Sequence, residues 1–301
     1  VSRDGGETWA WLGADSVKGN SFQYAFPSDA AEVRFCVSIP YVESDLKKFL
    51  ARHASNKNLE AGVLCRTAKG RDVERLRAGR LDGKASHRIL LTARHHACEM
   101  IASYTLEGIL EEALADPWYL ENVEILAIPF MDKDGVEDGD QGKGRKPRDH
   151  NRDYSDDSLY ASTKTLREFV PKWSEGKVKI ALDMHCPTLR GPYNETIYFV
   201  GTQNQENWKK ITRLAEILEA TRKGPLSYRV EDNLPFGQGW NKESNYTQGK
   251  TFKQWAVELP GNPWAGTIEI SYANANGATV TADSARAFGR DLARAIRKSL
   301  Q

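Results

Sequence analysis

Two histidines and a glutamate lie together where an apolar run gives way to a helical pattern. The segment Leu90–Met100 reads LLTARHHACEM, so the apolar run ends near Ala93 and is followed by His95, His96 and, three residues later, Glu99. Neutral imidazole and carboxylate groups are common zinc ligands, and a catalytic zinc often takes two histidines and one glutamate. Taken alone, the H-x-x-E spacing fits an ordinary polar loop better than a metal site.

Three further pieces of sequence could complete a catalytic metal site. His185 ends a second apolar run, Glu269 lies in a third, and a long polar loop contains DHNR at Asp149–Arg152. Taken singly, each has an ordinary explanation, as a core histidine, a salt-bridged glutamate and a solvated basic loop. A catalytic zinc needs three protein ligands and one open position, and His96, Glu99 and His185 would supply the three.

The other residues have the types that hydrolysis at such a metal requires. Zinc lowers the pKa of a bound water toward about 7 and polarises a carbonyl group. Glu269 can accept the proton of that water if the fold brings it close. A cationic side chain is needed for the oxyanion, and an arginine fork suits a substrate carboxylate. Asp149 can accept a hydrogen bond from a ligating histidine.

The elements that must position these residues alternate along the chain. Apolar runs predict strands at 89–93, 123–129, 178–184, 196–200 and 267–271. Amphipathic segments predict helices at 99–115, 162–173, 204–222 and 283–300. This alternation is typical of an α/β fold with a mixed, mostly parallel central sheet flanked by helices. Residues 71–84, which are charged and contain glycine, are interpreted as a linker or an exposed hairpin.

Composition narrows the classes of function. The 301 residues carry a net charge of +1, with 40% hydrophobic and 28% charged residues, which is typical of a soluble globular protein and gives no reason to expect a nucleic-acid partner. No apolar run reaches the roughly 18 residues that a membrane span needs. The chain begins at Val1, so we expect a truncated N-terminus. A cytoplasmic location is expected, and a signal peptide ahead of Val1 stays an open alternative.

In this order, the motifs resemble those of the M14 family of zinc carboxypeptidases, and most closely its cytosolic-carboxypeptidase branch. TARHHACE (Thr92–Glu99) resembles TARxHPGE, PFMDKDGVE (Pro129–Glu137) resembles PMxNPDGV, and DHNR resembles DLNR. LDMHC (Leu182–Cys186) resembles the DLH segment with its zinc histidine, and TIE (Thr267–Glu269) resembles the TxE segment with its catalytic glutamate. The chain departs from the pattern at Ala97 and Cys98, where the family has Pro-Gly.

The resemblance implies a phosphorylase/hydrolase-like catalytic domain of the zinc carboxypeptidase type over residues 78–301. A small β-sandwich domain, truncated at its start, is expected over residues 1–77. One Zn²⁺ is expected per chain, held by His96, Glu99 and His185. His95, adjacent in sequence, is the competing ligand.

The same resemblance implies roles for the remaining site residues. Glu269 is expected to act as general base and then general acid. Asn151 and Arg152 are expected to bind the terminal carboxylate of the substrate, and Asp149 to orient His96.

The oxyanion arginine of the family has no clear counterpart in the polar loop. Arg145 is the first choice for it and Arg148 the second. Tyr246 is a candidate for the tyrosine that closes over the substrate. Lys253 could favour an acidic C-terminal residue, with a solvated lysine as the alternative.

The expected activity is the removal of one C-terminal amino acid from a peptide or protein by zinc-activated water. The expected partner is therefore a peptide or protein C-terminus. Two alternatives stay open: a zinc-dependent deacylase or amidase acting on N-acyl amino acids, and a non-catalytic binding domain with a relict site. The presence of all three ligands and of Glu269 favours an enzyme.

Overall fold

A computed structural model describes residues 1–301, which form two compact units, Val1–Pro40 and Tyr41–Gln301. The first unit contains the short 3-10 helix η1 (Ala14–Ser16) and a hairpin of β1 (Val17–Lys18) and β2 (Ser21–Phe22). Every residue proposed for the metal site lies in the second unit. None of the helices combines the length and the apolar character that crossing a bilayer requires.

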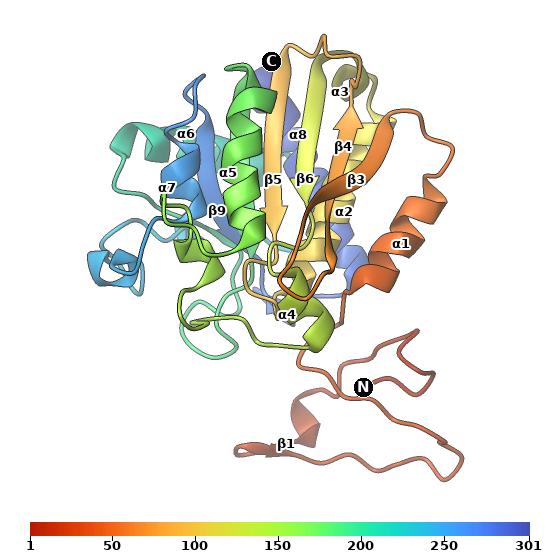
Figure 1. Cartoon of the computed structure of the whole chain (residues 1–301). Helices are drawn as coiled ribbons and strands as arrows, with labels where there is room; N and C mark the ends of the chain where they lie inside the picture. The colour runs from red at the N-terminus through yellow and green to blue at the C-terminus, as the bar shows by residue number, and fades with distance from the viewer. The chain divides into compact units, whose positions relative to one another are not determined.

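A seven-stranded sheet forms the centre of the second unit (Figure 1). Its spatial order is β3 (Leu59–Arg66), β4 (Asp72–Gly79), β6 (Val123–Ile128), β5 (His87–Ala93), β7 (Val178–His185), β9 (Trp264–Glu269) and β8 (Tyr198–Val200). Strands β6, β5, β7 and β9 are parallel, and β4 and β8 run antiparallel to their neighbours. The predicted α/β fold with a mixed, mostly parallel sheet is confirmed.

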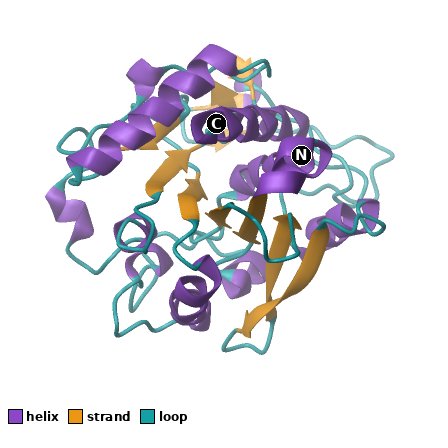
Figure 2. Ribbon diagram, turned by 90° about the horizontal axis from the view of Figure 1, so that it is seen from above, coloured by secondary structure: helices purple, strands orange, loops and turns teal.

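Helices cover both faces of this sheet (Figures 1 and 2). One face carries α2 (Met100–Ala115), α6 (Gln205–Thr221) and α8 (Ala282–Leu300), and the other carries α5 (Ala161–Ser174) and α7 (Phe252–Ala256). Gly108 and Gly289 allow α2 and α8 to approach closely, since a Cβ atom on Gly108 would lie 2.0 Å from the carbonyl oxygen of Arg286. The shorter elements are α1 (Glu43–Arg52), α3 (Pro117–Asn122), α4 (Lys133–Asp138), η2 (His150–Arg152), η3 (Val230–Asp232), η4 (Glu243–Tyr246), β10 (Asn274–Ala275) and β11 (Ala278–Thr279).

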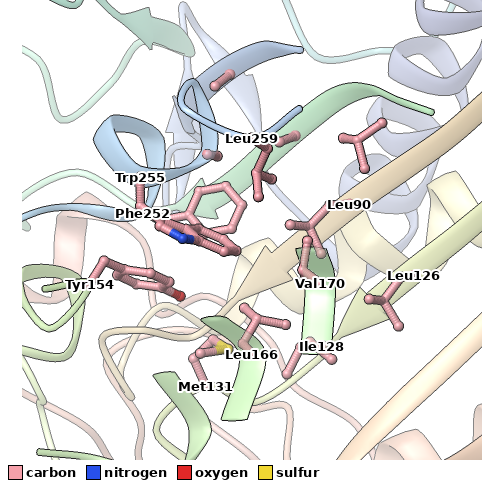
Figure 3. Packing of buried hydrophobic residues seen from close by; sticks show 14 of the residues in the cluster. Leu90, Leu126, Ile128, Met131, Tyr154, Leu166, Val170, Phe252, Trp255 and Leu259 are labelled. Atoms are coloured by element: carbon pink, nitrogen blue, oxygen red, sulfur yellow. The ribbon is translucent and has the colours of Figure 1, made fainter. Parts of the chain in front are cut away.

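A large apolar cluster fills the space between the sheet and helices α5 and α7 (Figure 3). Leu90 and Leu126 come from the central strands, Leu166 comes from α5, and Phe252 comes from α7. The central strands are continuous apolar runs because helices bury them on both sides. Tyr154 joins this cluster at the end nearest the carboxyl ends of the strands, so the core reaches directly to the site.

The division of the chain differs from the predicted boundary between residues 77 and 78. Strand β3 pairs with β4, and β4 pairs with β6, so residues 59–79 belong to the main sheet. The predicted linker at 71–84 was wrong for β4 because its charged side chains are paired. Glu74 lies 2.6 Å from Lys133, and Arg77 lies 2.7 Å from Glu124. The β-sandwich domain stays a prediction.

Candidate metal centre and active site

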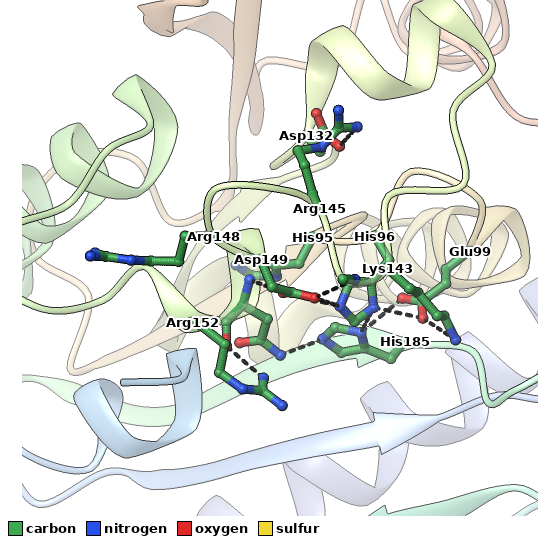
Figure 4. Close-up of polar contacts among 12 residues, drawn as sticks. His95, His96, Glu99, Asp132, Lys143, Arg145, Arg148, Asp149, Arg152 and His185 are labelled. Carbon is green, nitrogen blue, oxygen red and sulfur yellow. Dashed lines mark hydrogen bonds and ion pairs between the residues drawn. The ribbon is translucent and has the colours of Figure 1, made fainter. Parts of the chain in front are cut away.

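His96, Glu99 and His185 meet at the carboxyl ends of two neighbouring parallel strands (Figure 4). His96 follows β5, Glu99 is the residue that precedes the first turn of α2, and His185 is the last residue of β7. The Nδ1 atoms of the two histidines are 3.2 Å apart. Glu99 Oε1 lies 2.9 Å from Nδ1 of His96, and Glu99 Oε2 lies 2.8 Å from Nδ1 of His185.

Each of these two histidines faces a supporting carboxylate with its other ring nitrogen. Nε2 of His96 lies 3.1 Å from Oδ2 of Asp149, and Nε2 of His185 lies 2.5 Å from Oδ2 of Asp183. When Nε2 donates its hydrogen to a carboxylate, the neutral ring presents a lone pair at Nδ1. Two such lone pairs and the Glu99 carboxylate therefore point at one place. This donor set, with Glu99 Oε2 buried and accepting no hydrogen bond, fits a zinc ion.

The electrostatics of the site favour positive charge at the same place. Although burial opposes it, the charges of Glu99 and Asp149 raise the pKa of His96 to about 9. Burial likewise opposes, and Asp183 and Glu99 outweigh, the rise in the pKa of His185. The pKa of Asp149 is held below its ordinary value by His96 despite burial, and that of Asp183 by His185 and His95. The carboxylates thus stay ionised around the histidines.

His95 points away from the place where the three donors meet. Its Nδ1 lies 2.8 Å from Oδ1 of Asp183, and its Nε2 lies 2.7 Å from the hydroxyl of Tyr154. Asp183 also accepts a hydrogen bond from Thr92 at 2.8 Å. His95, Asp183 and His185 form a second close group of potential ligands. Because both ring nitrogens of His95 have partners within the protein, this group supports His185 rather than competing with His96.

The turn that separates the two adjacent histidines is held by a buried arginine. Arg94 has a φ of 64°, in the left-handed region that few residues other than glycine adopt. Its guanidinium donates to the carbonyl oxygens of Ala97 at 2.9 Å and Tyr41 at 2.8 Å, and to the hydroxyl of Ser103 at 3.0 Å. This network holds a strained backbone at a functional site.

Glu269 lies beside the metal ligands because of the register of the sheet. It is the last residue of β9 and is paired directly with His185 of β7. The side chain is buried, and its Oε2 has no hydrogen-bond partner. Burial raises the pKa of Glu269, and the nearby Glu99 carboxylate adds to the rise while His185 opposes it. A carboxylate with a raised pKa and a free oxygen is suited to accept a proton.

Neither arginine proposed for the oxyanion reaches the site, which corrects the sequence-based assignment (Figure 4). Arg145 is paired with Asp132 at 2.5 Å and with Asp140 at 3.0 Å. Arg148 is paired with Asp153 at 3.1 Å and with Asp157 at 2.6 Å. Both guanidinium groups point away from the histidines, and neither residue lines the cleft beside them. The spacing along the loop could not show that these arginines have acidic partners elsewhere.

The residues predicted to bind the substrate lie beside the metal site. Asn151 Nδ2 lies 3.1 Å from Nε2 of His185, and its Oδ1 accepts a hydrogen bond from the backbone of Phe252 at 3.0 Å. Arg152 donates to the carbonyl oxygens of Asn151 at 2.8 Å and Asn245 at 3.1 Å. Arg152 makes no salt bridge, so its charge is available to an anionic ligand.

Tyr246 also lies in this cleft, next to two cations. The Arg152 guanidinium lies 5.3 Å from the centre of its ring, and Nζ of Lys253 lies 5.4 Å from it. The hydroxyl donates to Oδ1 of Asn241 at 2.5 Å. The cleft has a volume of about 670 Å³ and is lined by the three proposed metal ligands, Glu269, Arg152, Tyr246 and Lys253 among others.

Comparison with known proteins identifies the fold. No family model and no curated protein sequence matches the chain. Among solved structures, the metallo-carboxypeptidase from Burkholderia cenocepacia is similar, with a TM-score of 0.69 and 18% identity over 88% of this chain and 70% of that one. The fold is that of the metallo-carboxypeptidases.

Two further structures with this fold come from distant organisms. A metallo-carboxypeptidase from Pseudomonas aeruginosa has a TM-score of 0.65 and 19% identity, over 88% of this chain and 71% of that one. The carboxypeptidase A from Helicoverpa armigera has a TM-score of 0.60 and 12% identity, over 89% of this chain and 74% of that one. The similarity therefore extends over most of each chain while few residues are identical.

The cation that reaches the metal site is Lys143, which the sequence analysis missed. Its Nζ lies 2.9 Å from Oε1 of Glu99, and it donates to the carbonyl oxygens of Cys186 at 2.8 Å and Pro187 at 3.1 Å. Despite burial, the charges of Glu99 and Glu269 raise the pKa of Lys143, so it is held as an ammonium ion.

The loop before Lys143 explains how it arrives there. Gly142 has a φ of 84°, and a Cβ atom on it would lie 2.4 Å from the backbone nitrogen of Ala97. Only glycine allows the loop to pack this closely against the segment that carries His96. The glycine-flanked lysine in GKG was a visible signal, but a search restricted to arginine excluded it.

Proposed function

We propose that this protein is a zinc-dependent carboxypeptidase that removes the last amino acid of a peptide or protein. The observation that carries the proposal is the convergence of two histidine Nδ1 atoms and the Glu99 carboxylate beside the buried, partly unsatisfied carboxylate of Glu269. The solved structures that share the fold are described as metallo-carboxypeptidases. His96, Glu99 and His185 would hold the zinc ion.

Each side chain around the scissile bond has a defined task. When bound, zinc would polarise the scissile carbonyl group and lower the pKa of a water molecule. Glu269 accepts a proton from the attacking water and returns it to the leaving amine. The Lys143 ammonium donates a hydrogen bond to the oxygen on which negative charge develops, in place of the family's arginine.

The substrate is held by its free carboxylate. Arg152 lines the cleft without a carboxylate partner, and its planar fork suits bidentate binding of a terminal carboxylate. The side chain of Asn151 is fixed by Phe252 and lies close to His185, so it helps to fix the position of the clamp relative to the metal. Asp149 and Asp183 hold the two ligating rings in place.

The test combines metal analysis with a measurement of C-terminal release. We expect one zinc ion per chain by mass spectrometry, and release of single amino acids from peptides that cover all twenty terminal residues. Amidated peptides, which lack the terminal carboxylate, are the control and should resist cleavage. Hydrolysis of N-acyl amino acids without hydrolysis of peptides would assign the site to the deacylase class instead. Zinc binding without hydrolysis of either class would contradict the enzyme.

A further inference from the structure

Lys253 is a buried ammonium group without a counter-ion. It lies on α7 and is 4% exposed, and its Nζ faces the cleft near the end of β8. Its hydrogen bonds go to the carbonyl oxygens of Gly201 at 2.8 Å and Val200 at 3.3 Å, and to the hydroxyl of Tyr246 at 3.3 Å. All three partners are neutral. A buried charge that has only neutral partners is costly, and an anion that reaches it gains a strong interaction.

The other cations around the cleft show that this is a selective arrangement. Lys143, Arg145 and Arg148 each form a salt bridge with a carboxylate of the protein. Arg152 and Lys253 do not, although both line the cleft and both lie against the ring of Tyr246. The cleft therefore presents two uncompensated cations around one aromatic side chain. A ligand that satisfies both must carry two anionic groups on neighbouring parts of one molecule.

We propose that Lys253 binds the side-chain carboxylate of an acidic C-terminal residue while Arg152 binds the α-carboxylate of the same residue. This inference rests on the proposed carboxypeptidase function and names its substrate class, peptides that end in glutamate or aspartate. A neutral terminal side chain would bury the Lys253 ammonium without an anion, and a basic one would repel it. The remaining wall near Lys253 is formed by Val200, Thr251 and Thr267, which leaves the ammonium as the charged group of this subsite.

The competing explanation is structural. Lys253 ties α7 to the end of β8 through two carbonyl oxygens, and such a lysine could serve stability alone. The two explanations differ in what Lys253→Met should change. A structural lysine predicts a lower melting temperature and an unchanged profile of terminal residues. A specificity lysine predicts loss of the distinction between glutamate and glutamine termini.

The experiment compares peptides that differ only in a terminal Glu or Gln, which have nearly the same shape. For the zinc-loaded wild-type protein we expect kcat/KM to be higher for the Glu peptide by roughly 100-fold, as expected when a buried charged partner is lost. Lys253→Met should bring the ratio close to one while it still cleaves the Gln peptide. Lys250→Met is the matched control, because Lys250 pairs with Glu258 at 2.8 Å and does not line the cleft.

A binding measurement keeps the test informative if a variant is unstable or turnover is slow. Zinc-loaded Glu269→Gln protein, titrated in a calorimeter, should bind the Glu peptide more tightly than the Gln peptide by a similar factor. Equal cleavage and equal binding of the two peptides by protein with Lys253 intact would overturn the assignment of Lys253 and leave the carboxypeptidase function standing. Tighter binding of the Glu peptide without cleavage of any peptide by the wild-type protein would support Lys253 and contradict the proposed function.

Discussion

The two ends of the cleft carry opposite excess charge. At the metal end, the carboxylates of Glu99, Asp149 and Asp183 surround two imidazole rings within a few ångströms. At the substrate end, Arg152 and Lys253 have no acidic partner, and their hydrogen bonds go to carbonyl oxygens and to one tyrosine hydroxyl. The first arrangement stabilises a cation and the second an anion. Both ligands can therefore be inferred from unmatched charge in the protein.

This contrast separates functional charge from structural charge. Between α2 and α8, Glu107 pairs with Arg286 at 2.7 Å and Glu111 pairs with Arg290 at 2.9 Å, so the charges there are balanced within the protein. A fold that leaves buried charge unbalanced loses stability unless a ligand compensates it. The predictions that follow alter one end of the cleft while the other end stays intact.

The largest effect is expected from Glu269→Gln, at the metal end. The change removes the proton acceptor but keeps the shape, so turnover should fall by about 10²–10⁴-fold while zinc content and fold persist. A rate assay, a zinc assay and a thermal melt on one preparation test this. Glu258→Gln is the control, because Glu258 is exposed and pairs with Lys250. A lower melting temperature with a rate above about a tenth of wild type would make Glu269 a structural residue.

The next largest effect is expected from Lys143→Met, which removes the cation beside Glu99. Loss of an oxyanion donor typically lowers kcat by about 10²–10³-fold, and KM should change much less. Lys143→Arg should restore part of the rate, because the family uses arginine for this task. Arg145→Met is the control and should keep most of the activity, since Arg145 is paired with Asp132 away from the cleft. If Arg145→Met lost more activity than Lys143→Met, the assignment of the donor would be wrong.

A smaller effect is expected from Asp149→Asn, which weakens the support of His96. Loss of such a partner typically lowers metal affinity or activity by about 10–100-fold. Zinc affinity can be measured by competition with a chelator, without any assay of turnover. Asp157→Asn removes a carboxylate from the same loop, paired with Arg148, and should leave zinc affinity unchanged. Full zinc affinity in Asp149→Asn would show that Asp149 only shapes the loop.

The smallest effect is a pH dependence at the substrate end. Burial and the neighbouring Arg152 lower the pKa of Lys253 to about 7, although Glu269 and Asp183 oppose the shift. Lys253 is therefore an ammonium below that pH and a neutral amine above it, whereas a terminal glutamate side chain stays ionised above about pH 5. The ratio of kcat/KM between Glu and Gln peptides should be largest near pH 6 and should fall by about tenfold for each pH unit above 7.

Use of a ratio between two peptides cancels the titration of groups that act on both. Lys253→Met should show a flat ratio across the same range, which is the control. A ratio in the wild-type protein that stays constant from pH 6 to pH 8 would show that the charge of Lys253 does not select the substrate.

Much of the metal end could be predicted from the sequence because its residues follow strands in recognisable motifs. His96, His185 and Glu269 each lie at the end of a predicted strand, and parallel strands that share one direction bring their ends together. The helices and strands could also be predicted, since apolar runs and amphipathic segments mark them. The assignment of zinc to these residues stays a prediction.

The parts that could not be predicted depend on tertiary contacts. Strand β4 is rich in charged residues, and its place in the sheet depends on partners such as Lys133 and Glu124, which are distant in sequence. The choice between Arg145 and Lys143 depends on how a glycine-rich loop packs against Ala97. A lysine in sequence is most often solvated, so the burial of Lys253 became evident only from the fold.

The central claim, a zinc site built from His96, Glu99 and His185, is tested most directly by anomalous diffraction at the zinc absorption edge from crystals of the protein. The account predicts one peak per chain, bonded to Nδ1 of both histidines at about 2.0–2.1 Å and to the Glu99 carboxylate. A peak on His95 and Asp183 instead, or His185 turned away from His96 in zinc-loaded protein, would contradict it.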